Sequence, residues 1–320
     1  MSSIEPIPFE KNEIGETNSI FQQPWWLEVV APGQWGEVVV KRGEEVAARM
    51  PYVIKKKYGL TALTMPPLTQ TLGPWLRPSK AKYARRISEQ KQLMNELIEQ
   101  LPEVDYFCQN FSPFITNWLP FYWAGFEQTT RYTYRIEDLS DLEKVWQGFL
   151  DNIRTDIRKA EKKIVVRSDL GLDQFLRVNA LTFNRQGMQV PYTPELIRNI
   201  DNACEIHNAR RMFFAEDAKG QIHAVLYLIW DSNTAFYLMG GGDPDLRNSG
   251  ATSLLMWEAI KFASTVSKVF DFEGSMIESV ERFFRSFGGI QTPYYQITKM
   301  SRRMRMAYHG RELVKAIFDR

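Results

Sequence analysis

The stretch from residue 237 to residue 263, YLMGGGDPDLRNSGATSLLMWEAIKFA, constrains the fold more than any other part of the chain. Its apolar start is typical of a β-strand, three glycines end that strand, and a largely apolar run then begins a helix. Free N–H groups at a helix start, a glycine that permits close backbone approach and a nearby arginine form a diphosphate cradle. A glycine-capped loop before a packed helix explains the same pattern, and both explanations stay open. The cradle would consist of Arg247, Asn248, Ser249, Gly250, Ala251 and Thr252.

The two halves of the chain follow the same order of predicted elements. Each half has a hairpin with a charged turn, then a strand, a Gly- or Pro-rich loop, a helix and a short strand with an acidic residue. The acidic strands are residues 104–106 (VDY) and 270–272 (FDF). A duplicated α/β unit of about 150 residues would account for the length of the chain. Walker A, GxGxxG and GxSxG motifs are absent, which disfavours nucleotide hydrolases and esterases.

The boundaries of the two halves follow from a predicted connecting helix. Apolar residues recur three, four or seven apart over 139–164, and Ser140 with Glu143 forms a capping-box pair. We therefore predict a first domain at 1–138 without a cofactor loop, a connecting helix at 139–168, and a second domain at 169–320 with the cofactor loop and a basic C-terminal helix.

Composition places the chain among ordinary globular proteins. Forty basic against 38 acidic residues leave a net charge of +2, too balanced for the whole molecule to be a nucleic-acid binder. Cys108 and Cys204 have no metal or redox spacing, and the three histidines are far apart, so no metal cofactor is expected. Prolines interrupt the uncharged runs at 58–76 and 106–126. With an acidic N-terminus that lacks an apolar core, the chain is predicted to be cytoplasmic.

The pattern at 247–252 resembles the cofactor loop of the GNAT acyltransferases, Q/R-x-x-G-x-G/A, with Thr252 at the last small position. In that family the strands on either side of the following helix are parallel and splay apart, and the pantetheine arm of acyl-CoA pairs with the exposed backbone. The resemblance implies acyl-CoA as the acyl donor. The first half has three prolines in the corresponding loop and no R-x-x-G, so only the second half is expected to bind the cofactor.

Two further stretches resemble the Fem-type proteins, the peptidoglycan aminoacyltransferases and their relatives with two GNAT-like domains. Residues 153–162 (IRTDIRKAEK) resemble their R-x-x-I-R-K-A-E-K element, and residues 271–289 resemble their D-F-x-G … F-K-x-x-F-G-G run. The similarity in order covers most of the chain. It implies an α/β fold of two tandem GNAT-like N-acyltransferase domains with mixed central sheets flanked by helices.

One departure from the Fem pattern bears on function. Phe284 stands where the family has a lysine, so a phosphate contact is lost unless Arg285 substitutes. With no counterpart of the coiled-coil arm, the chain resembles more closely the acyl-CoA-dependent branch, which would acylate an amine on a cell-envelope or glycan-type acceptor. Two alternatives stay open: an aminoacyl-tRNA-dependent peptidoglycan aminoacyltransferase, and a catalytically silent binding module on the same fold.

Acyl transfer to an amine needs a group that removes a proton and a group that protonates the leaving thiolate. Glu273 follows a strand that ends beside Gly274, where a glycine would leave room for the acceptor, so we predict it as the base. Tyr237 is the candidate acid. A helix-capping role for Glu273 and a packing role for Tyr237 remain open, because the helix that carries a tyrosine in many GNAT enzymes has Phe283 and Phe284 here.

Four residues are candidates for substrate binding. Arg185 lies in a stretch that resembles the family's R-x-G at the substrate cleft and could clamp an anionic acceptor, or complement a helix dipole. Trp118 and Tyr122 resemble a cleft wall, although core packing explains them equally well. Arg285 completes the set.

Three basic stretches, at 77–91, 154–167 and 299–320, are compatible with solvated helix faces. Their functional interpretations are binding of transfer RNA, or of an anionic membrane surface that presents a lipid-linked amine acceptor. The second would place the protein at the periphery of the inner membrane face. The acceptor is otherwise expected to be a small molecule.

Overall fold

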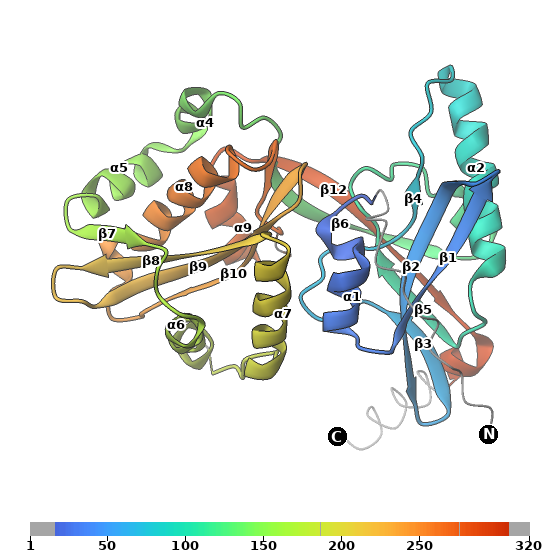
Figure 1. Cartoon of the computed structure of the whole chain (residues 1–320), viewed down its shortest axis with the longest axis horizontal. Helices are drawn as coiled ribbons and strands as arrows, with labels where there is room; N and C mark the ends of the chain where they lie inside the picture. Colours follow the sequence, from blue (N-terminus) through green and yellow to red (C-terminus); the bar gives the residue numbers. More distant parts are fainter. Residues whose placement is uncertain (1–16, 186, 275, 307–320) are drawn as a thin grey trace, which may run out of the picture. The chain divides into compact units, whose positions relative to one another are not determined.

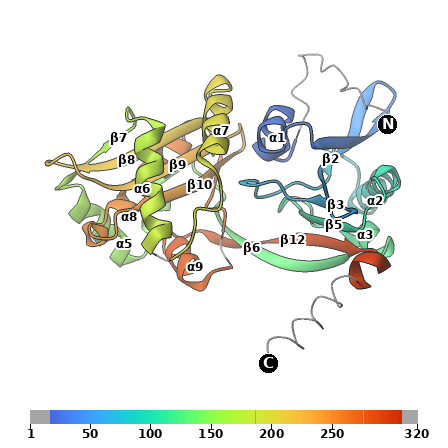
Figure 2. The same ribbon diagram turned by 90° about the horizontal axis from the view of Figure 1, so that it is seen from below.

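Two compact units make up the chain (Figures 1 and 2). Unit 1 consists of Met1–Arg131 and Tyr294–Arg320, and unit 2 consists of Tyr132–Pro293. The chain passes from unit 1 to unit 2 inside one strand and returns inside another, β6 (Glu127–Ile136) and β12 (Ile290–Met300). The structure is a computed structural model, and it describes residues 17–185, 187–274 and 276–306.

Unit 1 contains a mixed sheet whose strands lie in the order β1-β2-β3-β5-β12, with the short β4 paired to β2. The first three strands are antiparallel neighbours, β5 is parallel to β3, and β12 is antiparallel to β5. The remaining strands of this unit are β1 (Trp35–Arg42), β2 (Glu45–Lys57), β3 (Leu60–Thr64), β4 (Trp75–Leu76) and β5 (Tyr106–Asn110).

Helix α2 (Tyr83–Gln100) packs on β1 and β2 and supplies two buried residues, Met94 and Leu97, to the core of unit 1. Their spacing of three places both side chains on one face of the helix. Two shorter helices have proline in their first turn, where its missing N–H is not needed. They are α1 (Pro24–Val30), which follows the 3-10 turn η1 (Ile20–Gln22), and α3 (Leu119–Trp123).

The strands of unit 2 lie in the order β6-β11-β10-β9-β8-β7. The central strand β9 reads IHAVLYLIW and is buried along nearly its whole length, as a strand covered on both faces must be. Strand β11 is parallel to β10 and antiparallel to β6. The remaining strands are β7 (Ile164–Arg167), β8 (Arg210–Asp217), β9 (Ile222–Trp230), β10 (Thr234–Gly242) and β11 (Val269–Asp271).

Helices cover both faces of the unit 2 sheet. Figure 1 shows α4, α5 and α8 above strands β8–β10 and α6 and α7 below them. Helix α8 is buried on nearly all sides, and α5 packs against it. The helices are α4 (Leu142–Gly148), α5 (Asp151–Ala160), α6 (Leu172–Arg185), α7 (Pro194–Ile206), α8 (Ala251–Ala263) and α9 (Glu278–Arg285), with the 3-10 turn η2 (Arg247–Ser249) before α8.

The predicted repeat is present in both units. Strands β1-β2-β3, helix α2 and strand β5 in unit 1 follow the same topology as β8-β9-β10, α8 and β11 in unit 2. Each repeat is completed by a strand that follows the other repeat in the sequence: β12 pairs with β5, and β6 pairs with β11. The acidic residues of the two short strands were predicted to be equivalent, but they are not. Asp105 precedes the first residue of β5, whereas Asp271 is the last residue of β11.

The segment predicted as one connecting helix contains two helices and a strand of unit 2. The chain leaves helical geometry at Phe149 and Leu150, whose ψ angles are 145° and 151°. Asp141, not Ser140, caps α4, because its carboxylate accepts a hydrogen bond of 3.0 Å from the Lys144 N–H.

The C-terminal part of the predicted second domain is also divided differently, since residues from Tyr294 onward belong to unit 1. Residues 302–306 of the predicted basic helix are helical, and the rest of that helix lies outside the described residues.

Candidate active site

Strands β10 and β11 separate beside the loop that was predicted to bind a cofactor. Their parallel pairing ends at Phe236 and Asp271, although β10 continues along β9 to Gly242. A bulge between Tyr237 and Met239 interrupts the register at the point where the strands part. The β10 backbone beyond Phe236 therefore borders a gap in the sheet, which is the splay that the GNAT resemblance implied.

A hollow of about 450 Å³ lies at the N-terminus of α8. Thr252 of this hollow lies close to the end of β10, because a Cβ atom added to Gly242 would be 3.7 Å from its hydroxyl oxygen. Ser249 instead serves the loop itself, where its hydroxyl accepts a hydrogen bond of 3.3 Å from the N–H of the buried Ala251. The lining comprises four of the six predicted residues, Arg247, Asn248, Gly250 and Thr252, together with Asp156, Ser253 and Phe283.

Gly250 is required by the packing of the protein itself. Its φ of +76° lies in the left-handed region, and an added Cβ atom would be 2.5 Å from the carbonyl oxygen of Asp156 on α5. A larger residue would therefore disturb the contact between α5 and α8. The sequence left two explanations open for this glycine, approach of a ligand and a capped loop before a packed helix, and the neighbour that the structure places there is protein backbone.

Glu273 lies two residues beyond the last pair of β11, beside the gap. Its Oε1 atom is buried and has no hydrogen-bond partner among the described residues. Burial, and secondarily the charge of Asp271, raises the pKa of Glu273 well above its ordinary value. An enclosed carboxyl oxygen without a partner is costly in a folded protein, so this group is available to a ligand.

Asp271 has a structural role beside it. Its Oδ1 accepts hydrogen bonds from the Thr133 hydroxyl at 2.5 Å and from the Glu273 N–H at 2.8 Å, and its Oδ2 is 3.6 Å from Nε of Arg135. Neither carboxylate caps α9, whose N-cap residue is Ile277 and has no side-chain cap. The helix-capping interpretation of Glu273 is therefore wrong.

Tyr237 lies at the bulge of β10 and contacts Phe284 of α9 edge to face, with the ring centroids 5.6 Å apart. Burial, then the nearby Tyr192 and Glu273, raises the pKa of Tyr237, so its hydroxyl keeps its proton at neutral pH. The structure thus brings together the base and the acid that the sequence predicted. Their roles as base and acid belong to the proposed function.

Asn179 of α6 and Tyr192, which sequence reasoning missed, hold the end of β10 in place. Nδ2 of Asn179 donates to the Gly240 carbonyl at 2.8 Å, and its Oδ1 accepts from the Tyr192 hydroxyl at 2.8 Å. Burial raises the pKa of Tyr192 to about 12. Thr182, one turn after Asn179, accepts a hydrogen bond of 3.0 Å from the Gly242 N–H. A polar residue on an otherwise apolar helix face was the signal available in the sequence.

Gly274 was predicted to leave room for an acceptor, but it does not. A Cβ atom added there would be 2.3 Å from Cα of Thr133 and 2.4 Å from the carbonyl oxygen of Tyr132. The strand β6 occupies the space, and its proximity explains the glycine.

The predicted substrate-binding residues are dispersed. Arg185 is exposed at the end of α6, and Arg285 is exposed on α9, where it pairs with Glu281 at 2.9 Å. Arg285 does not line the hollow at α8, so nothing supports it as a substitute for the missing family lysine. Trp118 and Tyr122 belong to unit 1, where their rings contact each other with centroids 5.5 Å apart, and Tyr122 is exposed.

Comparison with known families identifies this site. Residues 147–275, which include the β10–β11 gap, Glu273 and the lining of the hollow except Phe283, match the family model described as an acetyltransferase (GNAT) domain. This part of the chain is similar to a GNAT acetyltransferase domain. The match confirms the resemblance that the R-x-x-G pattern predicted. No sequence among the curated proteins matches the chain.

Solved structures extend the likeness to most of the chain. FemX is 13% identical, with a TM-score of 0.66, over 86% of this chain and 91% of FemX. The C-terminal domain of a candidate lysylphosphatidylglycerol synthetase from Agrobacterium fabrum is 14% identical, with a TM-score of 0.53, over 87% of this chain and 88% of that domain. L-PGS from Bacillus licheniformis is 10% identical, with a TM-score of 0.52, over 87% and 89%. The fold is therefore the Fem-type GNAT-like fold that was predicted.

In unit 1, the gap that corresponds to the GNAT site is filled by the chain. The pairing of β3 with β5 ends at Leu63 and Phe107, and the loop before α2 then returns, so that Leu72 donates its N–H to the Asn110 carbonyl at 2.7 Å. Gln109, two residues beyond the last pair, accepts from the Gly73 N–H at 3.2 Å and donates to the Pro51 carbonyl at 2.9 Å.

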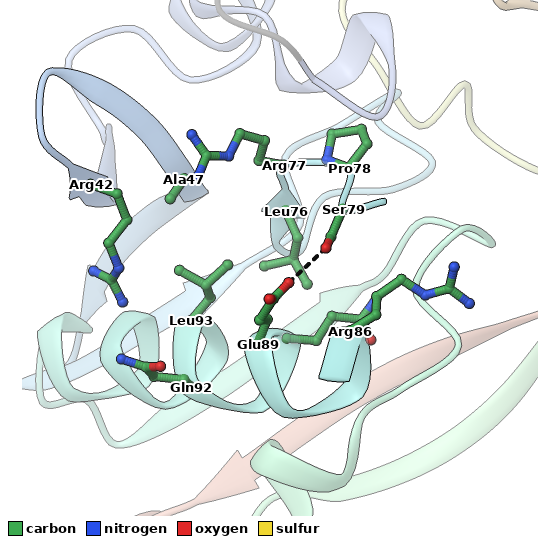
Figure 3. A pocket seen from close by; sticks show the side chains of 11 residues that line it. Arg42, Ala47, Leu76, Arg77, Pro78, Ser79, Arg86, Glu89, Gln92 and Leu93 are labelled. Atoms are coloured by element: carbon green, nitrogen blue, oxygen red, sulfur yellow. Dashed lines mark hydrogen bonds between the residues drawn. The ribbon is translucent and has the colours of Figure 1, made fainter. Parts of the chain in front are cut away.

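A hollow of about 490 Å³ flanks α2 in unit 1 (Figure 3). Its guanidinium groups point in different directions, and two of them are already paired, Arg42 with Glu96 and Arg77 with Glu45. The Ser79 hydroxyl donates to Glu89 at 2.6 Å across the hollow. Two of its guanidinium groups and its one hydroxyl group therefore already have protein partners.

Within the described parts of the chain, no helix is long and apolar enough to cross a membrane, and no group of His, Cys, Asp or Glu is arranged to hold a metal ion.

Proposed function

We propose that the GNAT domain of unit 2 transfers an acyl group from acyl-CoA to an amine. The observation that carries the proposal is the buried Oε1 of Glu273, which has no hydrogen-bond partner among the described residues and lies beside the β10–β11 gap. Tyr237 at the same gap supplies a protonated hydroxyl. A GNAT domain supports acyl transfer in general, and these two groups support transfer to an amine.

The donor would be held at the N-terminus of α8. The guanidinium of Arg247, the hydroxyls of Thr252 and Ser253 and the first N–H groups of the helix suit a diphosphate, and Phe283 offers an apolar wall. Coenzyme A supplies the acyl group as a reactive thioester. Asp156 also lines the hollow, and its carboxylate would have to be solvated or turned away from the phosphates.

Two protons move in the proposed reaction. As the amine nitrogen bonds to the acyl carbon, Glu273 accepts the proton that the nitrogen loses. As the carbon–sulfur bond breaks, the Tyr237 hydroxyl donates a proton to the departing sulfur. The raised pKa of Glu273 makes its ionised form a stronger base than an ordinary carboxylate.

The acceptor that we propose is an amine on a cell-envelope or glycan-type molecule, either small or lipid-linked. Arg185 and Arg285, which belong to unit 2 as Glu273 does, remain candidates for binding it. The lysylphosphatidylglycerol synthetase shares the fold at low identity, and the lipid in its name supports an envelope acceptor.

An aminoacyl-tRNA donor is the second candidate, because the FemX fold covers most of the chain. Against it stands Phe284, which is buried against Tyr237 and Phe272 where the Fem pattern has a lysine. No described cation replaces that lysine in the hollow except Arg247.

The test is turnover with acetyl-CoA and, separately, with charged transfer RNA, over a panel of amines. Glu273→Gln is expected to lower turnover by about 10²–10⁴-fold with little change in CoA affinity, because general-base assistance is lost. Tyr237→Phe should lower it as well. Glu278→Gln, an exposed residue of α9, is the control and should leave turnover unchanged.

Turnover with charged transfer RNA alone would replace the donor that we propose. CoA binding without turnover of any amine would instead support a catalytically silent module.

A further inference from the structure

The turn between β2 and β3 presents exposed cations that the sequence analysis did not single out. Lys55, Lys56 and Lys57 are all exposed, and Tyr58 follows them with 88% of its surface accessible. The φ of Tyr58 is +53°, a left-handed conformation that an aromatic residue rarely adopts. The turn therefore holds a large aromatic side chain out into solvent.

The chain returns to this turn after β12. Asp105 donates its N–H to the Thr61 carbonyl at 2.8 Å, and its carbonyl accepts from the Ser301 N–H at 2.8 Å, so the end of β12 lies beside the start of β3. A Cβ atom added to Gly59 would be 3.6 Å from Nη2 of Arg303. The residues after β12 thus bring further exposed cations to the same place, Arg302, Arg303 and Arg305.

These six cations, with Tyr58, form a surface that we call the basic tip. Among the described residues, none of the six forms an ion pair, whereas Arg77, Arg85 and Arg154 of the predicted basic stretches pair with carboxylates. The half-buried carboxylate of Asp105 accepts hydrogen bonds from the Thr61 N–H at 3.0 Å and the Ser301 hydroxyl at 3.2 Å. The exposed Glu103 is the remaining acid in that segment, so the tip keeps a strong positive charge.

We propose that the basic tip binds an anionic phospholipid surface. Each lysine or arginine close to such a surface strengthens binding about fivefold, and tyrosine favours the headgroup region. Met306, 70% exposed on the short helix after β12, adds an apolar side chain to the same segment. A projecting turn suits a flat bilayer better than nucleic acid, which proteins hold in basic grooves with stacked aromatic rings. The proposal does not depend on the activity of unit 2.

The experiment is co-flotation of the full chain with phosphatidylcholine vesicles, with and without phosphatidylglycerol. The triple variant Lys55→Gln, Lys56→Gln, Lys57→Gln should bind the anionic vesicles on the order of a hundredfold more weakly. The matched control changes three exposed lysines of unit 2, Lys159, Lys162 and Lys163, to Gln and should bind as the wild type does. Tyr58→Asn removes the ring but keeps a residue that tolerates a positive φ, and it should weaken binding by a smaller factor that persists at high salt.

Equal loss in both triple variants would show non-specific attraction and overturn the proposal. So would unchanged binding in Tyr58→Asn, or no binding to anionic vesicles at low salt. Binding of transfer RNA that the lysine substitutions in the tip abolish, in the absence of vesicle binding, would assign the tip to nucleic acid instead.

Discussion

The two repeats of this chain open the same gap in their sheets and use it differently. In unit 1 the loop before the helix folds back into the gap, and the residue two positions beyond the last parallel pair, Gln109, has both ends of its amide hydrogen-bonded to that loop and to β2. In unit 2 the corresponding residue is Glu273, whose Oε1 has no described partner. A gap that the protein fills cannot admit a ligand, and a gap that leaves a carboxyl oxygen unsatisfied is suited to one.

The comparison also shows why prolines mattered in the sequence. Pro66, Pro67 and Pro74 lie in the loop that fills the first gap, and that loop carries the short strand β4 before α2 begins. The unit 2 loop has no such excursion and passes from β10 into η2 and α8. We therefore propose that only unit 2 binds the donor.

The largest effect is expected from placing a carboxylate in the filled gap. Gln109→Glu removes the donor to the Pro51 carbonyl and sets an acidic group in a fully buried site, which should lower the free energy of unfolding by about 2–4 kcal/mol. Chemical denaturation measures it, with the exposed Gln174→Glu as a control that should be nearly neutral. A stable Gln109→Glu protein would mean that the unit 1 gap tolerates a charged group, and the contrast between the units would fail.

A smaller effect, on CoA affinity, should distinguish the hollow at α8 from the hollow beside α2. If CoA binds at α8 as proposed, Arg247→Gln should weaken CoA binding about tenfold, because one charge-assisted hydrogen bond at an exposed site is lost. Arg86→Gln in the unit 1 hollow is the matched change and should have no effect. Titration calorimetry measures both, and the opposite result would move the donor to unit 1. Gly250 is unsuitable for this test, because any side chain there would collide with α5.

Local pattern was enough to predict the repeat and the strand–loop–helix order around Arg247. These features depend on short-range periodicity and on motifs whose residues are adjacent in the sequence. The break at Phe149 and Leu150 was missed, because the apolar spacing continues through it while two residues leave helical geometry.

The sequence did not predict which distant residues would contact each other. The glycines at 250 and 274 suggested approach of a ligand, but the backbones of Asp156 and of Tyr132 and Thr133 lie there. Two features depend on contacts between distant segments that periodicity does not encode. They are the exchange of β6 and β12 between the repeats and the approach of Arg303 to Gly59.

The smallest effect concerns the cost of keeping Glu273 unsatisfied. Its pKa is raised in the folded protein, so above the ordinary value of 4.5 the unfolded chain loses a proton that the folded chain retains. Below pH 4.5 the protonated carboxyl therefore makes its full contribution to the free energy of unfolding. As the pH rises from 4.5 toward the pKa of Glu273 in the folded protein, the free energy of unfolding falls by at most about 1.4 kcal/mol per pH unit. Glu273→Gln removes this dependence.

The variant should consequently melt at a higher temperature than the wild type at neutral pH, by about 2–4 °C for each kcal/mol. The difference should shrink as the pH is lowered toward 4.5, the ordinary pKa of the Glu273 carboxyl. Calorimetric melting curves over this range measure it. A difference that does not change with pH would mean that Glu273 ionises in the folded protein as it does in the unfolded chain. The carboxyl would then be satisfied in solution like Gln109 in unit 1, and the contrast between the two gaps would rest on the loop alone.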